Sequence, residues 1–110
     1  MTPIQTATNT ALPPIKVGGW PLAIAITPDG KTAYVVNQDS GTVTPIRIAT
    51  NTALPPIRTG GNPFEIAITP DGKTAYVSLV TAEVVPIRTS TNTALPRLKT
   101  GYSGPIAITP

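Results

Sequence analysis

The sequence contains no cysteine and no histidine among its 110 residues. Disulfides, thiolate clusters, imidazole metal sites, haem ligation by histidine and nucleophiles activated by histidine are therefore excluded by inventory. Acidic residues are also scarce, because Asp and Glu together number five. Two of them, Asp29 and Asp71, occupy equivalent turns one repeat apart, which is too distant for paired acid-base catalysts. We therefore predict a non-enzymatic chain with no catalytic residue and no cofactor.

Long apolar runs and clusters of charge are missing as well. No apolar stretch approaches the roughly 20 residues that a membrane span needs, and the N-terminal residues do not open a signal peptide. The net charge is +3, but the basic residues are spread along the chain and no two are adjacent. Such spacing favours a solvated rim over a surface for an anionic polymer. We expect no membrane span and no nucleic-acid partner.

Repetition is what the sequence does have. The segment from Ile26 to Val35 returns unchanged from Ile68 to Val77, and a third copy begins at Ile108. An apolar run enters, Pro-Asp-Gly turns the chain, and a short run with Tyr and Val follows, which predicts a β-hairpin. Pro presets φ, Asp bonds its own backbone, and Gly accepts the positive φ of such turns.

A second repeated segment fixes the period of the chain. Residues 7–15 read Ala-Thr-Asn-Thr-Ala-Leu-Pro-Pro-Ile, return at 49–57, and return with changes at 90–98. The period is thus 42 and then about 41. A spacing of roughly 40 to 45 residues with four short strands is typical of a β-propeller blade. Helical repeats are disfavoured because Pro, Thr and Gly interrupt every candidate helix.

Each repeat predicts four strands, which in the first full unit are 22–27, 32–36, 42–48 and 53–58. The first is apolar on both faces, as expected for the innermost strand of a blade packed on both sides. The fourth carries Pro55-Pro56, which cannot donate ladder hydrogen bonds, so it is predicted to be the outer edge. Pro45 in the third strand predicts a strand end or a bulge.

The predicted fold class is all-β, with propeller blades of four antiparallel strands in an incomplete propeller of about 2.75 blades. Gly60-Gly61 carries the chain from the rim of one blade to the axis of the next. The predicted segments are a partial blade over 1–19, full blades over 20–61 and 62–102, and the first strand of a further blade over 103–110.

The repeat resembles a known family. Residues 34–37 read Tyr-Val-Val-Asn, and with the preceding Thr-Pro-Asp-Gly-Lys-Thr and the following Ala-Thr-Asn-Thr they look like the YVTN-family β-propeller repeat. The second unit departs, because it reads Tyr-Val-Ser-Leu at 76–79. The resemblance implies likeness to surface-layer and exported propellers, hence an extracellular or cell-surface location, and more distantly to redox or lactone-cleaving propellers. The His ligands of such enzymes are missing here.

Two kinds of connection differ between the copies, namely the one that leads into the first strand and the one between the second and third strands. In an up-and-down blade both emerge on the same side, which we call the variable face, and divergent loops are where a propeller binds partners. The alternative is that these side chains fill gaps between blades or have drifted after duplication. The predicted residues of the face are Trp20, Asn37, Gln38, Asp39, Asn62, Phe64, Glu65 and Tyr102.

The polar loop over residues 37–40 is also the one local candidate for a calcium site, although a polar hairpin loop has the same composition. Our first functional prediction is a binding or structural scaffold for a protein or glycan. The alternative is a segment of a larger propeller hydrolase or redox enzyme whose active residues lie elsewhere, and a third reading is a fragment without a function of its own. The exposed blade faces predict contact with further blades or with a second copy, and two copies would supply about six blade positions.

Overall fold

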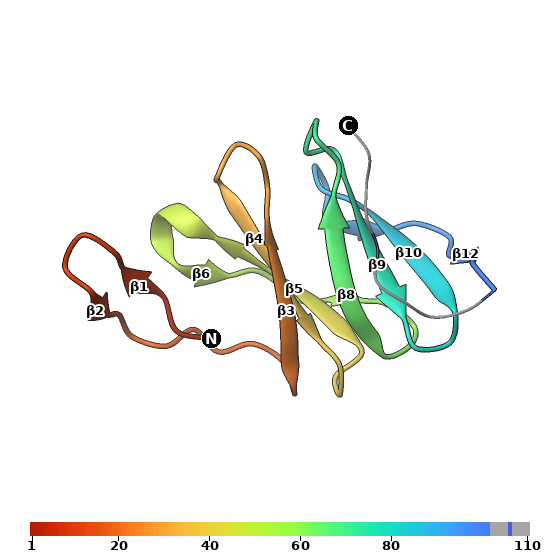
Figure 1. Cartoon of the computed structure of the whole chain (residues 1–110), viewed down its shortest axis with the longest axis horizontal. Coiled ribbons are helices and arrows are strands. Elements are labelled where there is room, and N and C mark those ends of the chain that lie inside the picture. The colour runs from red at the N-terminus through yellow and green to blue at the C-terminus, as the bar shows by residue number, and fades with distance from the viewer. Residues whose placement is uncertain (102–105, 107–110) are drawn as a thin grey trace.

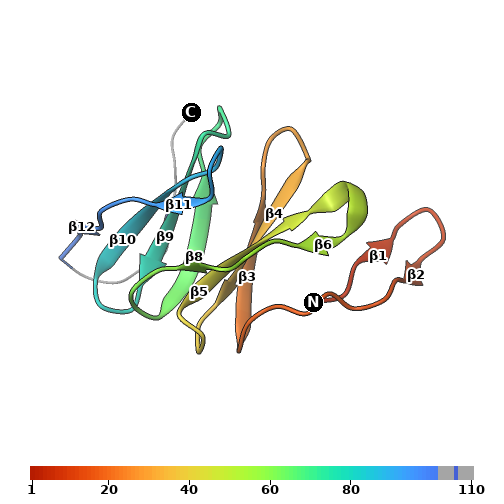
Figure 2. The ribbon, with the colours of Figure 1, turned by 180° about the vertical axis from the view of Figure 1, so that it is seen from behind.

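The computed structural model describes residues 1–101 and residue 106. The described residues form three antiparallel β-sheets that lie side by side along the longest axis of the molecule (Figure 1). A small N-terminal hairpin stands at one end, a five-stranded sheet lies in the middle, and a second five-stranded sheet lies at the other end. The same order is seen from behind in Figure 2. We call the two larger sheets the first and second blade.

The strands repeat with the period of the sequence. The N-terminal hairpin consists of β1 (Ile4–Gln5) and β2 (Thr10–Ala11). The first blade consists of β3 (Pro21–Ile26), β4 (Thr32–Asn37), β5 (Thr42–Arg47), β6 (Thr52–Ala53) and β7 (Ile57–Arg58), with a 3-10 turn at Ile48–Thr50. The second blade consists of β8 (Pro63–Ile68), β9 (Thr74–Leu79), β10 (Glu83–Arg88), β11 (Thr93–Ala94) and β12 (Leu98–Lys99).

The strand order confirms the predicted blade. In the first blade β3, β4 and β5 are hydrogen-bonded in sequence order, and β6 and β7 both pair with β5. The second blade repeats this order with β8 to β12. The first strands β3 and β8 pack against each other, as expected at the centre of a propeller. The predicted segment at 103–110 lies outside the described residues, apart from residue 106.

The predicted strand end or bulge at Pro45 is wrong. Pro45 pairs with Tyr34 in the middle of β5, and the β4–β5 register is continuous. The Pro45 carbonyl accepts a bond of 2.8 Å from the Leu54 N–H, so the proline nitrogen faces the outer edge of the blade. There the fourth strand is split into β6 and β7 by residues 54–56. The missing N–H therefore costs no ladder hydrogen bond.

The same arrangement recurs in the other copies. The Leu95 N–H bonds the Pro86 carbonyl at 2.8 Å, and the Leu12 N–H bonds the Pro3 carbonyl at 2.9 Å. The prolines of the third and fourth strands are thus related. A third-strand proline has no N–H to donate, so it is tolerated where the adjacent fourth strand is interrupted and needs no such donor. The prolines in the sequence therefore interrupt the outer strand, and fraying of its end is not the cause.

The core lies between the blades. One cluster joins the two blades and includes Tyr34, Val36 and Ile57 from the first and Ile66 and Val77 from the second. A smaller cluster on the other side of the first blade joins β4 and β5 to the segment that follows the N-terminal hairpin. Alternate residues of β4 serve the two clusters, as the two-residue period of a strand requires. Each blade therefore buries its faces against its neighbours.

Where a neighbour is incomplete, apolar side chains stay exposed. Leu22, Ile24 and Ile26 of β3 are 45%, 50% and 56% exposed on the side of the N-terminal hairpin. The hairpin has no first and second strands to cover them. Ile66, which occupies the same place in the second blade as Ile24 in the first, is only 7% exposed because the first blade covers it.

The Pro-Asp-Gly turns form as predicted. Asp29 Oδ1 accepts bonds from the Thr27 hydroxyl at 2.7 Å and from the Lys31 N–H at 2.9 Å. Gly30 takes the positive φ of 73° that the turn needs. In the second blade Asp71 accepts the equivalent bonds from Thr69 and Lys73 at 2.6 and 2.9 Å. These carboxylates build turns and are directed at their own loops.

Candidate functional site

The connections assigned to the variable face do lie on one side of the blades. The Gln38 N–H bonds the Trp20 carbonyl at 2.9 Å, and the Val80 N–H bonds the Asn62 carbonyl at 2.9 Å. In each blade the loop between the second and third strands is therefore fastened to the connection that leads into the first strand. These backbone bonds hold both connections in place, so the side chains of the two connections have defined positions.

Trp20 is the most prominent side chain of this face. Its backbone lies in the left-handed region with φ 53°, and its side chain is 62% exposed. A bulky residue at positive φ is uncommon and is kept only where the surroundings hold it. Here the Trp20 carbonyl is fixed by Gln38, and the Gly19 N–H bonds the Ser40 hydroxyl at 2.5 Å.

The prediction for Asn37 is wrong, because its side chain is 0% exposed and cannot meet a partner. Its Nδ2 donates to the Thr42 and Thr44 hydroxyls of β5 at 3.2 and 2.9 Å. The neighbouring strand thus satisfies the amide nitrogen, whereas the buried Oδ1 has no hydrogen-bond partner among the described residues. In the second blade Leu79 and Val85 occupy the places of Asn37 and Thr44, and both are buried in the core. The final Asn of the repeat therefore ties two strands together.

The other predicted residues divide into two groups. Asp39 and Asn62 are exposed and line a shallow cavity of about 270 Å³ with Ser40, Arg58 and the glycines between them. Gln38, Phe64 and Glu65 are half-buried. Glu65 Oε1 accepts a bond from the Ile66 N–H at 3.2 Å. Tyr102 lies outside the described residues. The structure thus brings Trp20, Asp39 and Asn62 to one exposed side.

The loop at residues 37–40 contains a single carboxylate, that of Asp39, and the Asn37 side chain is buried with its Nδ2 donating to β5. In the described part of the chain no group of three or more His, Cys, Asp or Glu residues is placed to hold a metal ion. Over the same residues no helix has the length and apolar character for crossing a membrane.

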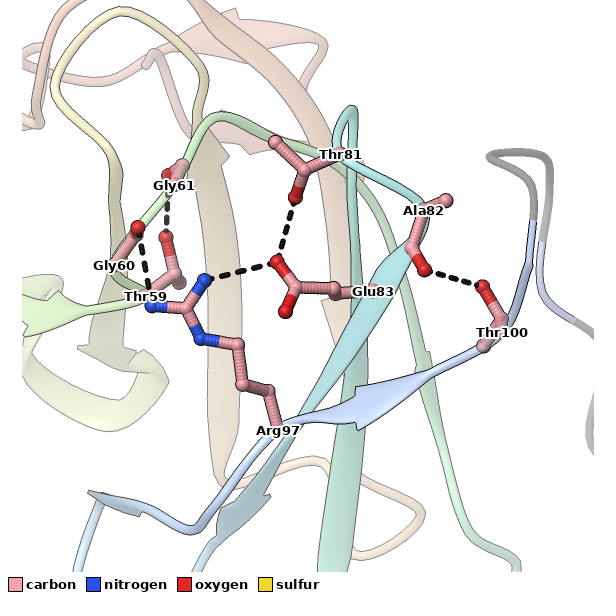
Figure 3. A network of polar contacts seen from close by, with 8 residues as sticks. All are labelled: Thr59, Gly60, Gly61, Thr81, Ala82, Glu83, Arg97 and Thr100. Carbon is pink, nitrogen blue, oxygen red and sulfur yellow. Dashed lines mark hydrogen bonds and ion pairs between the residues drawn. The ribbon is translucent and has the colours of Figure 1, made fainter.

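A polar network that sequence reasoning missed crosses the variable face between the blades (Figure 3). Arg97 Nη1 donates to Glu83 Oε1 at 2.9 Å, and Arg97 Nη2 donates to the Gly60 carbonyl at 3.3 Å. Thr81 donates to the same Glu83 oxygen at 2.8 Å. Gly60 has φ 78°, and a side chain there would collide with the Arg97 guanidinium. The network joins the connection between the blades to the outer edge of the second blade.

The network is visible in the sequence as a pair of changes. Arg97 stands where the earlier copies have Pro14 and Pro56, and Glu83 stands where the first blade has Thr42. The bond from Thr81 and then the Arg97 guanidinium hold the pKa of Glu83 below its usual value, so the carboxylate stays charged. The charge of Lys99, which lies opposite Glu83 on β12, also lowers the pKa of Glu83. Two coupled departures from a repeat are the signal that would have found it.

No family model matches the sequence, and no curated protein matches it. Solved structures do match. Hydrazine synthase from Kuenenia stuttgartiensis is similar at 31% identity with a TM-score of 0.87 over 93% of this chain. A functionally unknown protein from Desulfotomaculum acetoxidans DSM 771 is similar at 24% identity with a TM-score of 0.81 over 98%. The β-propeller domain of Cps50 (Swd1) from Myceliophteria thermophila is similar at 13% identity with a TM-score of 0.70 over 81%.

These likenesses show the β-propeller fold of the chain. The chain spans 30%, 38% and 28% of those three solved chains, or about a third of their length. The structures that resemble it include an enzyme and a WD40-type domain. The fold is therefore compatible with both functional classes and does not distinguish them.

Proposed function

We propose that this chain is a non-catalytic segment of a YVTN-type β-propeller that binds a partner protein through its variable face. The observation that carries the proposal is Trp20, which is 62% exposed on a left-handed backbone that hydrogen bonds hold in place. Exposed Trp side chains held on rigid frames are characteristic of binding hot spots. Asp39 and Asn62 lie on the same face and supply polar groups for the rim of such a contact.

The opposite side of the blades supports this choice by contrast. Its Pro-Asp-Gly turns are identical in the two blades, and their carboxylates and threonine hydroxyls are engaged within the turns. Side chains that satisfy one another locally have little left to offer a partner. The variable face is where the copies differ and where a large aromatic side chain is left uncovered.

A site-specific photo-crosslinker tests the proposal. A benzophenone amino acid at Trp20 is compared with the same group at Lys31, an exposed residue of the opposite turn. Irradiation in an extract of the source organism should give a discrete protein adduct from position 20 and none from position 31. The adduct should disappear when an excess of unlabelled chain competes for the partner, but remain when the competitor carries Trp20→Ala. Equal adducts from both positions contradict the proposal, and adducts sensitive to glycosidase indicate a glycan partner instead.

A second candidate is favoured by the 31% identity to hydrazine synthase over 93% of the chain. In this reading the chain is part of a larger redox or hydrolytic propeller, and the reactive groups lie in other segments, since this chain has no His or Cys to ligate a metal or haem. The test is the absorption spectrum and metal content of the full-length protein purified from its source. A bound haem or metal, together with a redox or hydrolytic activity that Trp20→Ala leaves unchanged, would favour the enzyme reading over the scaffold reading.

A further inference from the structure

The two blades are joined by a hydrogen bond between side chains far apart in the sequence. The Tyr34 hydroxyl of β4 donates to Asn92 Oδ1 at 2.6 Å, across 58 residues. Tyr34 is buried and Asn92 occupies the turn between β10 and β11 with φ 52°. A second-strand tyrosine of one blade is thus tied to the outer turn of the next blade. We call this bond the blade tie.

The second blade carries an unused donor for the same tie. Tyr76 takes the place of Tyr34, since it pairs with Pro86 as Tyr34 pairs with Pro45. Its side chain points away from the first blade, because the neighbouring Ala75 and Val77 face the core between the blades. Its hydroxyl has no hydrogen-bond partner among the described residues. The second blade therefore presents half of a tie on its free face.

The N-terminal hairpin carries an unused acceptor in the required conformation. Asn9 lies in the turn between β1 and β2 with φ 51°, close to the 52° of Asn92. The same Thr-Asn-Thr sequence surrounds both, and the Thr8 and Thr10 hydroxyls bond each other at 2.7 Å. The turn is thus already shaped as an acceptor although no tyrosine reaches it.

The second blade and the hairpin each also carry an exposed apolar side chain. Leu98 of β12 is 53% exposed, whereas Ile57, its equivalent in the first blade, is 6% exposed in the core between the blades. Ile4 of β1 is 63% exposed, whereas its equivalent Ile87 is fully buried in that same core. The internal interface buries these two positions together. The free face of the second blade and the hairpin thus offer the two sides of one interface.

We propose that the hairpin β1–β2 of one copy docks on the free face of the second blade of another copy, as the second blade docks on the first. The Tyr76 hydroxyl donates to Asn9 Oδ1 of the neighbouring copy, and Leu98 packs against Ile4. The two surfaces differ, so the contact is heterologous and repeats from copy to copy until it closes into a ring or continues as a filament.

Sedimentation velocity over a range of micromolar concentrations tests the proposal on the intact chain. The wild type should self-associate. Tyr76→Phe and Asn9→Gly, in which glycine keeps the positive φ, should each weaken association about fivefold, as expected for about 1 kcal/mol from one hydrogen bond. The double variant should associate no more weakly than the weaker-associating single variant, because both substitutions remove the same hydrogen bond. Asn51→Gly is the matched control, because Asn51 has the same turn and φ 50° but lies outside the proposed contact.

Disulfide trapping provides a second measurement that small losses of stability do not disturb. The chain has no cysteine of its own, so chains carrying Leu98→Cys and Ile4→Cys can be mixed and oxidised without background. A cross-linked heterodimer should predominate over either homodimer. A monomeric wild type, which is expected if a further blade of a longer polypeptide covers this face, overturns the proposal. Equal effects of Asn9→Gly and Asn51→Gly, or trapping confined to homodimers, overturn it as well.

Discussion

Removal of one hydroxyl, in Tyr34→Phe, should loosen the two blades from each other without changing either blade. Tyr34 is 1% exposed, and its ring belongs to the core between the blades. Phenylalanine keeps that ring and its packing. The substitution deletes the 2.6 Å bond to Asn92 Oδ1 and leaves the rest of the interface in place.

The magnitude follows from the exposure of the two partners. A neutral hydrogen bond contributes a net of about 1 kcal/mol, and the cost rises when the remaining partner is buried and unpaired. Asn92 is half-buried, so water can replace the lost donor. We therefore expect Tyr34→Phe to lower the free energy of unfolding by about 1 kcal/mol, or a Tm by about 4 °C for a domain of this size.

Urea unfolding followed by circular dichroism measures this loss, and a double-mutant cycle with Asn92→Gly isolates the bond. Glycine keeps the positive φ of the turn, so this partner variant removes the acceptor without adding backbone strain. The double variant should lose no more than about 0.5 kcal/mol beyond the larger single loss. Full additivity of the two single losses would refute the blade tie.

The pH dependence gives an independent check on the same bond. Burial, and secondarily the charge of Asp29, raises the pKa of Tyr34 above its usual value of about 10. A folded-state pKa above the unfolded one means that the contribution of Tyr34 is complete below pH 10. It is then lost as the pH rises through the folded-state pKa. The alkaline loss of stability should therefore be smaller in Tyr34→Phe.

Three further predictions concern single positions. Asn37→Leu should lower the free energy of unfolding by about 2 kcal/mol in urea titrations, because two hydroxyls lose their donor, and adding Thr44→Val should recover part of it. Gly60→Ala should cost about 1 to 3 kcal/mol in the same assay, because an alanine is strained at its φ of 78°. The flexible Arg97 guanidinium would have to move aside, and an unchanged midpoint would contradict the need for glycine at this position. The Thr27 hydroxyl, and secondly the Lys31 N–H, lowers the pKa of Asp29. The contribution of Asp29 to the free energy of unfolding should therefore be complete above the usual pKa of an aspartate and be lost as the pH falls through the folded-state pKa. Asp29→Asn should make stability less dependent on pH in that acid range.

The fold could be predicted from the sequence because repetition shows which features are structural. The Pro-Asp-Gly turns, the four-strand order and the outer position of the double proline all follow from local chemistry that is written twice or more. The prediction for Pro45 is wrong because a proline at this position is tolerated only through the neighbouring strand, which leaves the ladder at the same level. That pairing is a tertiary fact, and no property of Pro45 alone contains it.

The variable face is harder to predict because residue type alone does not determine how exposed a side chain is. Asn37 and Asp39 are both polar loop-edge residues, yet one is fully buried between strands and the other is exposed. The strand period decides the difference: Asn37 ends β4 on the face where Thr42 and Thr44 lie, and Asp39 is beyond the strand. The boundary between strand and loop, and not the polar composition of the loop, therefore determines which of these side chains is exposed.

Divergence between the copies is coupled, and this coupling indicates which contacts matter. Where Asn37 becomes Leu79, its neighbour Thr44 becomes Val85, so a hydrogen-bonded pair is replaced by an apolar one. Replacing only one member of the pair would remove the hydrogen bond that the other member makes, which costs free energy. The tyrosine and asparagine of the blade tie show no such exchange, since every second strand and every outer turn in the described chain retains them. A pair of residues that is kept while its surroundings change is expected where every blade makes the same contact with the next.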